Sequence, residues 1–178
     1  MRKIVAIKAS MNLGLSEELK TDTAFPNITP QYIPLITNQK ISDPNWLVGF
    51  VSGEGCFLVD IQKSDSYRFK ERVRLFFTVT QHIRDELLIK SLIEYFDGCG
   101  NIYKDGEVYY YRVSKYYDIY NKIIPFFKKY AVKGIKSKNF DDFCKVAYMM
   151  KEKKHLTKQG LEQTKKIKAG MNTRRKWY

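Results

Sequence analysis

The sequence predicts an α+β domain in which a four-stranded antiparallel sheet is covered by helices on one face and open on the other. Three observations predict it. Helical and strand patterns follow one another in the order α-β-β-α-β-β-α. The strand patterns come in two adjacent pairs, as antiparallel hairpins do. One strand pattern alternates cleanly between an apolar and a polar face.

The first part of the chain lacks this regular pattern. Residues 1–41 contain Pro26, Pro30 and Pro34, whose spacing prevents a continuous helix and favours extended chain. A chain of 178 residues that is 44% hydrophobic is long enough for one packed domain with some extra chain. We therefore expect a connector over 1–41 and an α+β domain with a basic helical tail over 42–178.

The first helix of the expected domain has a clear start signal. Asp43 can cap free backbone amides, and Pro44 can occupy the first helical position without losing a hydrogen bond. The helix should run from about Pro44 to Glu54. Gly55 can adopt a positive φ and should end it.

Two strands should follow, at 56–63 and 73–80, joined by a polar, charged loop. The second strand carries two different faces, so one side should pack on a core while the other meets solvent or a ligand. The apolar face consists of Val73, Leu75, Phe77 and Val79, and the other face of Arg72, Arg74, Phe76, Thr78 and Thr80.

The rest of the domain repeats the scheme. Apolar residues recur at helical spacing over 83–96, and Asp97-Gly98 should stop that helix. Asp105-Gly106 is a hairpin dipeptide between strands at 101–104 and 108–114. Helices should follow at 117–130, interrupted at Pro125, at 139–153 and at 157–169.

The open face of this sheet is where function should be sought. In the fourth strand, a basic residue at Arg112 and a serine at Ser114 favour the open face, which places Tyr110 there as well. Together with Arg72 and Arg74 they form a basic surface with aromatic side chains among small polar ones. Such a surface suits phosphates and base edges, and a β-ribbon fits the major groove of DNA. The alternative is an ordinary solvated charged face.

The charge and composition of the chain indicate which kinds of partner it binds. The chain has 32 Lys and Arg against 19 Asp and Glu, a formal charge of +13, which attracts a polyanion such as nucleic acid. We expect no membrane partner, because no apolar run approaches the ~20 residues that a span needs. The three cysteines and two histidines have no zinc-ligand or disulfide spacing, so any metal should be held by oxygen.

Glycines give the helix at 44–54 an unusual face. Gly49 and Gly53 lie four residues apart on one side of it, and each costs about 1 kcal/mol relative to alanine within a helix. Glycines at this spacing allow two helix backbones to approach closely. We therefore expect Gly49 and Gly53 to form a helix-pair interface with a second copy of this kind of helix.

Glu54 is unusual because the last turn of a helix already presents partial negative charge. A bound divalent cation would reverse that penalty, and Mg²⁺ typically takes one or two protein carboxylates. Two paired helices would bring two such carboxylates together, an arrangement suited to phosphodiester hydrolysis with two metal ions. The alternative is a turn with an exposed acid.

The segment Leu47 to Gly55 resembles the LAGLIDADG motif of homing endonucleases. Leu47, Gly49 and Gly55 match its letters, and Glu54 stands for its metal-binding acid, while Ser52 and Gly53 depart from it. Over about 42–170, the predicted order of elements is that of one LAGLIDADG half-domain. The segment is most similar to the second motif of the fungal mitochondrial, single-chain subgroup.

The resemblance implies a metal-dependent, site-specific DNA endonuclease that uses Mg²⁺. It implies that Gln81 holds active-site water and that Lys136 lies near the scissile phosphate; by themselves they are an ordinary strand-end polar residue and one of many lysines. The family's DNA-facing positions alternate along the strands, and the residues of the second and fourth strands indicate the same face independently. The implied DNA-binding residues are Cys56, Leu58, Asp60, Gln62, Arg72, Arg74, Phe76, Thr78, Thr80, Asn101, Tyr103, Tyr110, Arg112 and Ser114.

The chain carries one such motif, whereas members of that subgroup resemble single chains with two. Residues 9–20 are similar to the segment that joins the halves in those proteins. We expect a second LAGLIDADG half as partner, in a homodimer or as a separate chain, and double-stranded DNA as substrate. The alternatives are an RNA-binding intron-splicing maturase and a component of an organellar ribosome. Abundant Lys, Tyr, Phe, Ile and Asn have AT-rich codons and favour an organellar genome as the source. The resemblance to the fungal subgroup implies an intron-encoded, mitochondrial origin.

Overall fold

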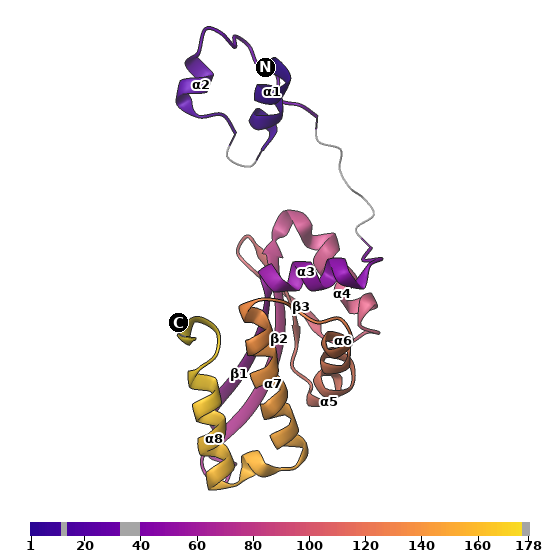
Figure 1. Cartoon of the computed structure of the whole chain (residues 1–178), viewed down its shortest axis with the longest axis vertical. Helices are drawn as coiled ribbons and strands as arrows, with labels where there is room; N and C mark the ends of the chain where they lie inside the picture. Colours follow the sequence, from indigo (N-terminus) through magenta and orange to yellow (C-terminus); the bar gives the residue numbers. More distant parts are fainter. Residues whose placement is uncertain (12–13, 33–39, 176–178) are drawn as a thin grey trace. The chain divides into compact units, whose positions relative to one another are not determined.

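The computed structural model describes residues 1–11, 14–32 and 40–175. The chain divides into two compact units, Met1–Thr37 and Asn38–Tyr178, and each is described by itself (Figure 1). The division lies within a few residues of the boundary expected from the sequence.

The first unit contains two helices, α1 (Arg2–Ser10) and α2 (Glu17–Thr21). Ser16 caps α2 by accepting a hydrogen bond from the amide of Leu19. The segment after α2 returns to α1, where Ser10 Oγ donates to the carbonyl of Gln31 at 2.7 Å. Residues 26–32 form no helix or strand, as expected, and 33–39 lie outside the described residues. A connector role for this unit stays a prediction.

The second unit has the predicted order of elements, extended by helices at the end of the chain. The amphipathic patterns located these elements well, with shifts of a few residues at their ends. In chain order they are α3 (Pro44–Glu54), β1 (Gly55–Lys63), β2 (Glu71–His82), the 3-10 turn η1 (Ile83–Asp85), α4 (Glu86–Tyr95), β3 (Asn101–Asp105), β4 (Val108–Val113), α5 (Tyr116–Asp118), the π-helical η2 (Ile119–Ile123), α6 (Ile124–Lys129), α7 (Ile135–Lys151), the 3-10 turn η3 (Lys154–Leu156), α8 (Lys158–Ala169) and the 3-10 turn η4 (Asn172–Arg174).

The four strands form one antiparallel sheet in the order β1-β2-β4-β3. Helices cover one face, and α7 runs alongside β1 and β2 (Figure 1). The core between sheet and helices is aromatic: the ring of Phe57 in β1 lies 5.3 Å from both Phe77 in β2 and Phe127 in α6. Large rings from both layers bury much apolar area and stabilise the sheet against the helices. The predicted α+β fold with one open face is confirmed.

Gly55 departs from its prediction. Its φ is −83° and its ψ 155°, so it is extended backbone, and the expected positive φ is wrong. Glycine is needed here for space: a Cβ on Gly55 would lie 2.5 Å from Val51 Cγ1 and 2.6 Å from the Val51 carbonyl oxygen. The missing side chain lets α3 pass directly into β1.

The helix around Pro125 also differs from its prediction, which was an interruption at this proline. The chain stays helical over 116–129, and η2 changes it from α-helix to π-helix just before Pro125, which lies in the first turn of α6. Proline has no backbone N–H to donate, and a π-helical turn just before it shifts the hydrogen-bonding pattern so that the helix continues. The start of α7 at Ile135, four residues before the predicted helix, follows from the positive φ of Gly134.

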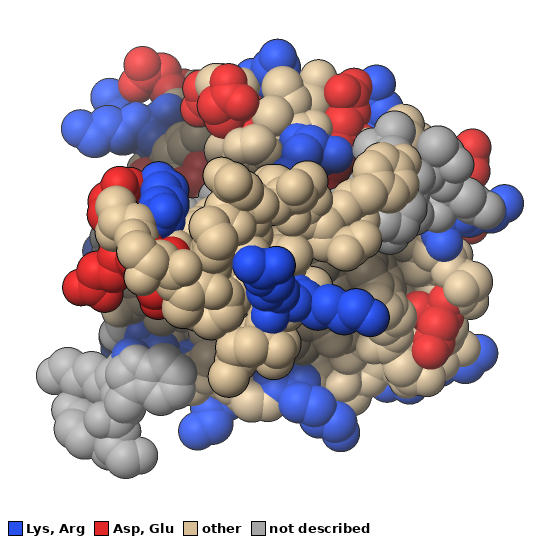
Figure 2. Space-filling view, turned by 90° about the horizontal axis from the view of Figure 1, so that it is seen from above, with Lys and Arg blue, Asp and Glu red and all other residues tan. Residues whose placement is uncertain are grey.

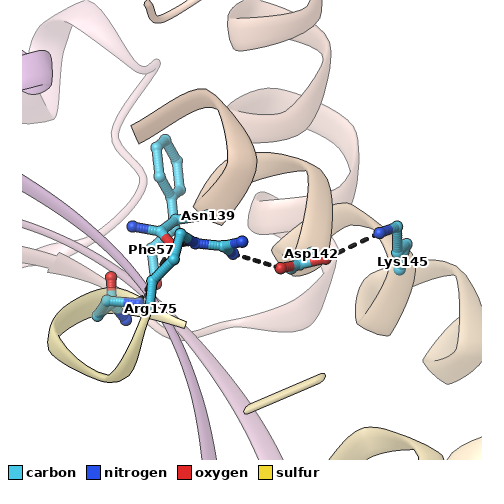
Figure 3. Close-up of polar contacts among 6 residues, drawn as sticks. Phe57, Asn139, Asp142, Lys145 and Arg175 are labelled. Carbon is cyan, nitrogen blue, oxygen red and sulfur yellow. Dashed lines mark hydrogen bonds and ion pairs between the residues drawn. The ribbon is translucent and has the colours of Figure 1, made fainter. Parts of the chain in front are cut away.

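A polar cluster ties the C-terminal residues to the core (Figure 3). Asn139 Oδ1, buried in α7, accepts from Arg175 Nε at 2.9 Å and from the backbone amide of Asn172 at 3.1 Å. The side-chain amide of Asn172 donates to the carbonyl of Phe57 at 3.1 Å. Arg175 also pairs with Asp142. These contacts hold the chain after α8 against both α7 and β1.

We expect Gly55→Ala to destabilise the fold by about 1–3 kcal/mol, because its Cβ would overlap Val51 in a packed region. Gly53→Ala is the matched control. A Cβ there meets no atom within 4 Å, so the isolated chain should gain up to about 1 kcal/mol of helix propensity. Urea unfolding followed by circular dichroism measures both. Equal midpoints for the two variants would contradict the close approach at Gly55.

Candidate active site and nucleic-acid interface

The strand register places the predicted nucleic-acid contacts on one face of the sheet. Residues directly opposite one another in antiparallel strands point to the same side. Cys56 pairs with Thr78, Thr78 with Arg112, and Arg112 with Asn101. The same alternation places Leu58, Asp60 and Gln62 of β1, Arg72, Arg74, Phe76 and Thr80 of β2, Tyr103 of β3 and Tyr110 of β4 on that face, and Ser114 follows β4 directly.

Phe76 lies on this open face but is buried, with 7% of its surface exposed. The guanidinium carbon of Arg74 lies 4.6 Å from the centre of its ring, and that of Arg112 lies 5.2 Å from it. Arginine is weakly hydrated and stacks well on aromatic faces. The Phe76 ring therefore serves as a platform that positions two arginines.

Arg112 occupies the centre of an aromatic cluster. Its guanidinium carbon also lies 5.0 Å from the ring centre of Tyr110 and 5.8 Å from that of Tyr103, and the two tyrosine rings stack at 5.3 Å. Arg112 Nε is buried, and no hydrogen-bond partner for it exists among the described residues. A buried donor without a partner is costly. The three rings fix the position of the arginine on the open face.

The edge of the open face at β1 includes residues that sequence reasoning missed. Lys168 of α8 pairs with Asp60 at 3.4 Å, and the Asn172 side chain lies 4.0 Å from Cys56 Sγ. Both partners lie more than a hundred residues away along the chain, so no local pattern indicated these contacts. Lys168 balances the negative charge of Asp60 on a face that otherwise carries Arg72, Arg74 and Arg112.

The three expected catalytic residues lie at one end of the β1–β2 pair. Glu54 is the last residue of α3 and is exposed. Lys136, in the first turn of α7, donates a hydrogen bond from Nζ to the carbonyl of the next residue, Gly55. Gly55 pairs with Val79, two residues before Gln81, whose Oε1 accepts from the His82 amide at 2.9 Å. The structure thus brings a carboxylate, an ammonium and an amide group to the same corner of the sheet.

Positive charge reaches from this corner onto the open face. Burial raises the pKa of the Cys56 thiol, and the charges of Lys136 and Arg112 partly oppose that rise. Cys56 is therefore a neutral thiol that lies close to both cations. All three cysteines are free thiols, of which Cys99 and Cys144 are buried and Cys56 is half-buried.

Glu54 fits a divalent metal ion in the chemistry of its donor atoms. It is an exposed oxygen ligand, and no ion pair involves it among the described residues. Within those residues no three acidic, histidine or cysteine side chains gather to hold a metal. Mg²⁺ needs only one or two protein carboxylates and completes its shell with water and phosphate oxygens.

The outer face of α3 is smooth and apolar. Leu47, Val48 and Val51 are buried in the core, whereas a Cβ added to Gly49 or Gly53 would meet no atom within 4 Å. Trp46 and Phe50, on the same outer side, stack with ring centres 5.2 Å apart, and Trp46 is 48% exposed. This face has the shape that a closely packed second helix requires.

Figure 2 shows Lys and Arg side chains, some of them near the centre of the view, together with Asp and Glu side chains and uncharged residues between them. None of the described helices is long and apolar enough to cross a bilayer.

The chain is similar to known DNA-cleaving proteins. The family model for LAGLIDADG endonucleases matches residues 47–147. A protein of Neurospora crassa named probable intron-encoded endonuclease 3 is 40% identical over 164 residues, which cover 90% of this chain and 30% of that protein. An uncharacterized 50.9 kDa protein in ND4 intron 1 of Podospora anserina is 32% identical over 146 residues, which cover 80% of this chain and 32% of that protein.

Solved structures of the homing endonuclease I-SmaMI are similar as well. In its complex with cleaved DNA, the TM-score is 0.91 at 48% identity, over 98% of this chain and 58% of that one. For I-SmaMI bound to uncleaved DNA in the presence of calcium ions, the TM-score is 0.89 at 48% identity. That match covers 96% of this chain and 58% of the I-SmaMI chain. The chain thus spans about a third of the two curated relatives and less than two thirds of I-SmaMI.

We expect Arg112→Ala to weaken binding to duplex DNA by about 1–3 kcal/mol, the value of a bidentate contact to guanine. Phe76→Leu, which removes the platform and keeps the charge, should show part of that loss. Lys63→Ala, at an exposed strand end, is the matched control for loss of one positive charge. Fluorescence anisotropy over a salt series measures all three. An Arg112 effect equal to that of Lys63 would contradict the central position of this arginine.

Proposed function

The chain belongs to the LAGLIDADG endonuclease family, and on that premise we propose that it is one half of a site-specific DNA endonuclease that hydrolyses phosphodiester bonds with a divalent metal ion. The observation that carries the proposal is the position of Glu54. It ends a helix with a smooth glycine face, beside Lys136, at the corner of an open sheet face that carries arginines. Carboxylate, cation and recognition surface therefore meet at one place.

The open face would bind double-stranded DNA. Arg72, Arg74 and Arg112 supply positive charge and donors for phosphates or guanine edges, while Thr78, Thr80 and Asn101 supply smaller polar groups. The net charge of +13 would draw the duplex to the protein before specific contacts form. This division of roles supports recognition by the sheet and cleavage at its corner.

Glu54 would hold the metal ion, which we propose to be Mg²⁺. When bound, a divalent ion activates water and stabilises the leaving oxygen in phosphodiester hydrolysis. Lys136 can offer positive charge to a scissile phosphate near Gly55, once its hydrogen bond to the Gly55 carbonyl is exchanged. Gln81 can orient a water molecule through its amide group, at the end of β2. These roles for Glu54, Gln81 and Lys136 are proposals.

A second LAGLIDADG half would complete the enzyme. Gly49 and Gly53 leave room for the backbone of a partner helix, and Trp46 and Phe50 flank that room. Pairing would place a second acidic residue next to Glu54, as hydrolysis with two metal ions requires. The partner is a homodimer mate or a different half-domain. Since relatives are named as products of introns in fungi, we propose an intron-encoded protein of mitochondrial origin.

We expect Glu54→Gln to reduce DNA cleavage to background, because it preserves size and removes the charge that a divalent ion requires. DNA affinity should stay the same or rise slightly, since a negative charge beside the phosphates is lost. The assay is cutting of a plasmid library in Mg²⁺ by the chain alone and by the chain supplied with a first half-domain, beside the variant and a chelator control.

Cutting that depends on metal and survives in Glu54→Gln would remove Glu54 from this role. If no wild-type assembly cuts DNA, and the chain binds structured RNA more tightly than any duplex, the maturase or ribosomal role is correct and the nuclease proposal is wrong.

We expect Gly53→Leu to abolish pairing with a second half, because a leucine side chain would fill the space at the helix face. The isolated chain should stay folded, as Gly53 is exposed. Lys138→Leu adds the same side chain at an exposed position of α7 and should pair normally. Light scattering gives the assembly mass. An unchanged assembly in the Gly53 variant would remove the helix-pair arrangement.

A further inference from the structure

The start of β1 is held from outside the sheet by two side chains. β1 lies at one edge of the sheet, where every second carbonyl points away from the neighbouring strand. Gly55 and Phe57 are two residues apart, and the carbonyl of each accepts a hydrogen bond from a side chain of another element. Lys136 of α7 binds the first carbonyl, and Asn172 of η4 binds the second at 3.1 Å. Because these carbonyls lie one and three residues after Glu54, the two contacts hold the chain next to the proposed metal ligand.

Lys136 and Asn172 are also joined through α7. Asn139 lies three residues after Lys136, on the same side of the helix. It is buried, and its Oδ1 accepts from the backbone amide of Asn172 at 3.1 Å and from Arg175 Nε at 2.9 Å. The contacts therefore form a closed loop from β1 through Lys136, α7, Asn139 and Asn172 back to β1. We name Asn139, Asn172 and Arg175 the Asn172 clamp.

An ion pair keeps Arg175 in the Asn172 clamp. Figure 3 shows the contacts that lead from Arg175 to Asp142 and from Asp142 to Lys145. Burial acts to raise the pKa of the Asp142 carboxyl, but the hydrogen bonds from Lys145 and Arg175 hold that pKa below its ordinary value. Asp142 is therefore charged at neutral pH, and Arg175 stays in place to bind Asn139.

The first turn of α7 depends on such contacts for its position. Gly134 precedes this turn and has no side chain that could cap the free amides. Lys136 lies in the same turn, where the partial positive charge of the helix dipole disfavours a cation. Local interactions therefore do not keep the ammonium group at this place. The hydrogen bond to Gly55 and the Asn172 clamp, one turn further along α7, do so.

We propose that Asn172 is a positioning residue for DNA cleavage, because it fixes the first turn of α7 against the start of β1 and so keeps Lys136 beside Glu54. The inference rests on the proposed function, in which Glu54 and Lys136 act on the scissile phosphate. Asn172 itself touches neither of these two side chains in the loop of contacts; it acts through the backbone of β1 and through Asn139. A displacement of about 1 Å at a reacting group is enough to slow a reaction about a hundredfold.

The backbone of Asn172 indicates the variant that tests this role. Its φ is 56°, a left-handed conformation that asparagine tolerates and glycine adopts freely. Asn172→Gly therefore keeps the backbone conformation and the amide that binds Asn139, and it removes only the side-chain bond to Phe57. Thr173→Gly is the matched control, since it makes the same kind of change at the next residue of η4, which is exposed. Urea unfolding of both variants shows that they are folded.

The first measurement needs neither DNA nor a second half. Lysine amines of the full chain are labelled with acetic anhydride, and the rate at each lysine is read by mass spectrometry. We expect Lys136, which is half-buried and hydrogen-bonded, to react about tenfold faster in Asn172→Gly than in the wild type. Lys138, exposed on the same helix, should react equally in all variants, and Thr173→Gly should match the wild type.

The second measurement is the rate of DNA cleavage by the assembly that cuts the plasmid library. We expect Asn172→Gly to lower the rate at saturation by about tenfold to a hundredfold, with the concentration for half-saturation nearly unchanged. In a Lys136→Ala background, Asn172→Gly should add little, because its effect passes through Lys136. A clamp that only stabilised the fold would lower the rate by the same factor in both backgrounds.

Three results would overturn the positioning role and leave the endonuclease proposal standing. They are unchanged labelling of Lys136 in Asn172→Gly, cleavage effects of Asn172→Gly and Lys136→Ala that multiply, and weaker DNA binding with an unchanged rate at saturation. The last result would make Asn172 a DNA contact. If no wild-type assembly cuts DNA, the positioning role fails together with the endonuclease proposal, and faster labelling of Lys136 would then support only the contact itself.

Discussion

The close approach of Gly55 to Val51 is the constraint on which the rest of the half-domain depends. Because Gly55 has no Cβ, α3 passes into β1 without a loop, with backbone atoms in contact. The helix can then bury Leu47 and Val51 in the same core as Phe57. Glu54 is held at the end of the sheet as a consequence, and Lys136 binds the Gly55 carbonyl. One missing side chain thus determines where the carboxylate lies.

The same sheet separates two kinds of packing. On the covered face, large rings such as Phe57 and Phe77 bury apolar area between strands and helices. On the open face, Phe76 is buried instead by the guanidinium groups of Arg74 and Arg112, which stack on its ring. Aromatic side chains therefore stabilise the fold on one side and orient cations on the other. That arrangement suits a surface that presents hydrogen-bond donors in fixed positions to a nucleic acid.

The proposed pairing with a second half-domain depends on the outer side of α3. The glycines of that side allow close backbone contact, and Trp46 and Phe50 stack beside them. The chain itself spans about a third of the length of its curated relatives.

The sequence by itself determined the order of elements, the two faces of β2 and the unusual chemistry of the segment from Leu47 to Gly55, because these depend on periodicity and on residue types that are costly in a helix. Only the tertiary structure decided the rest. Gly55 is required by contact with Val51, Phe76 is buried by Arg112, and Lys168 reaches Asp60 across the chain. The Phe76–Arg112 and Lys168–Asp60 contacts join residues far apart in sequence, and the Gly55–Val51 contact depends on how the helix passes into the strand. The position of each side chain therefore follows from packing and not from any local pattern.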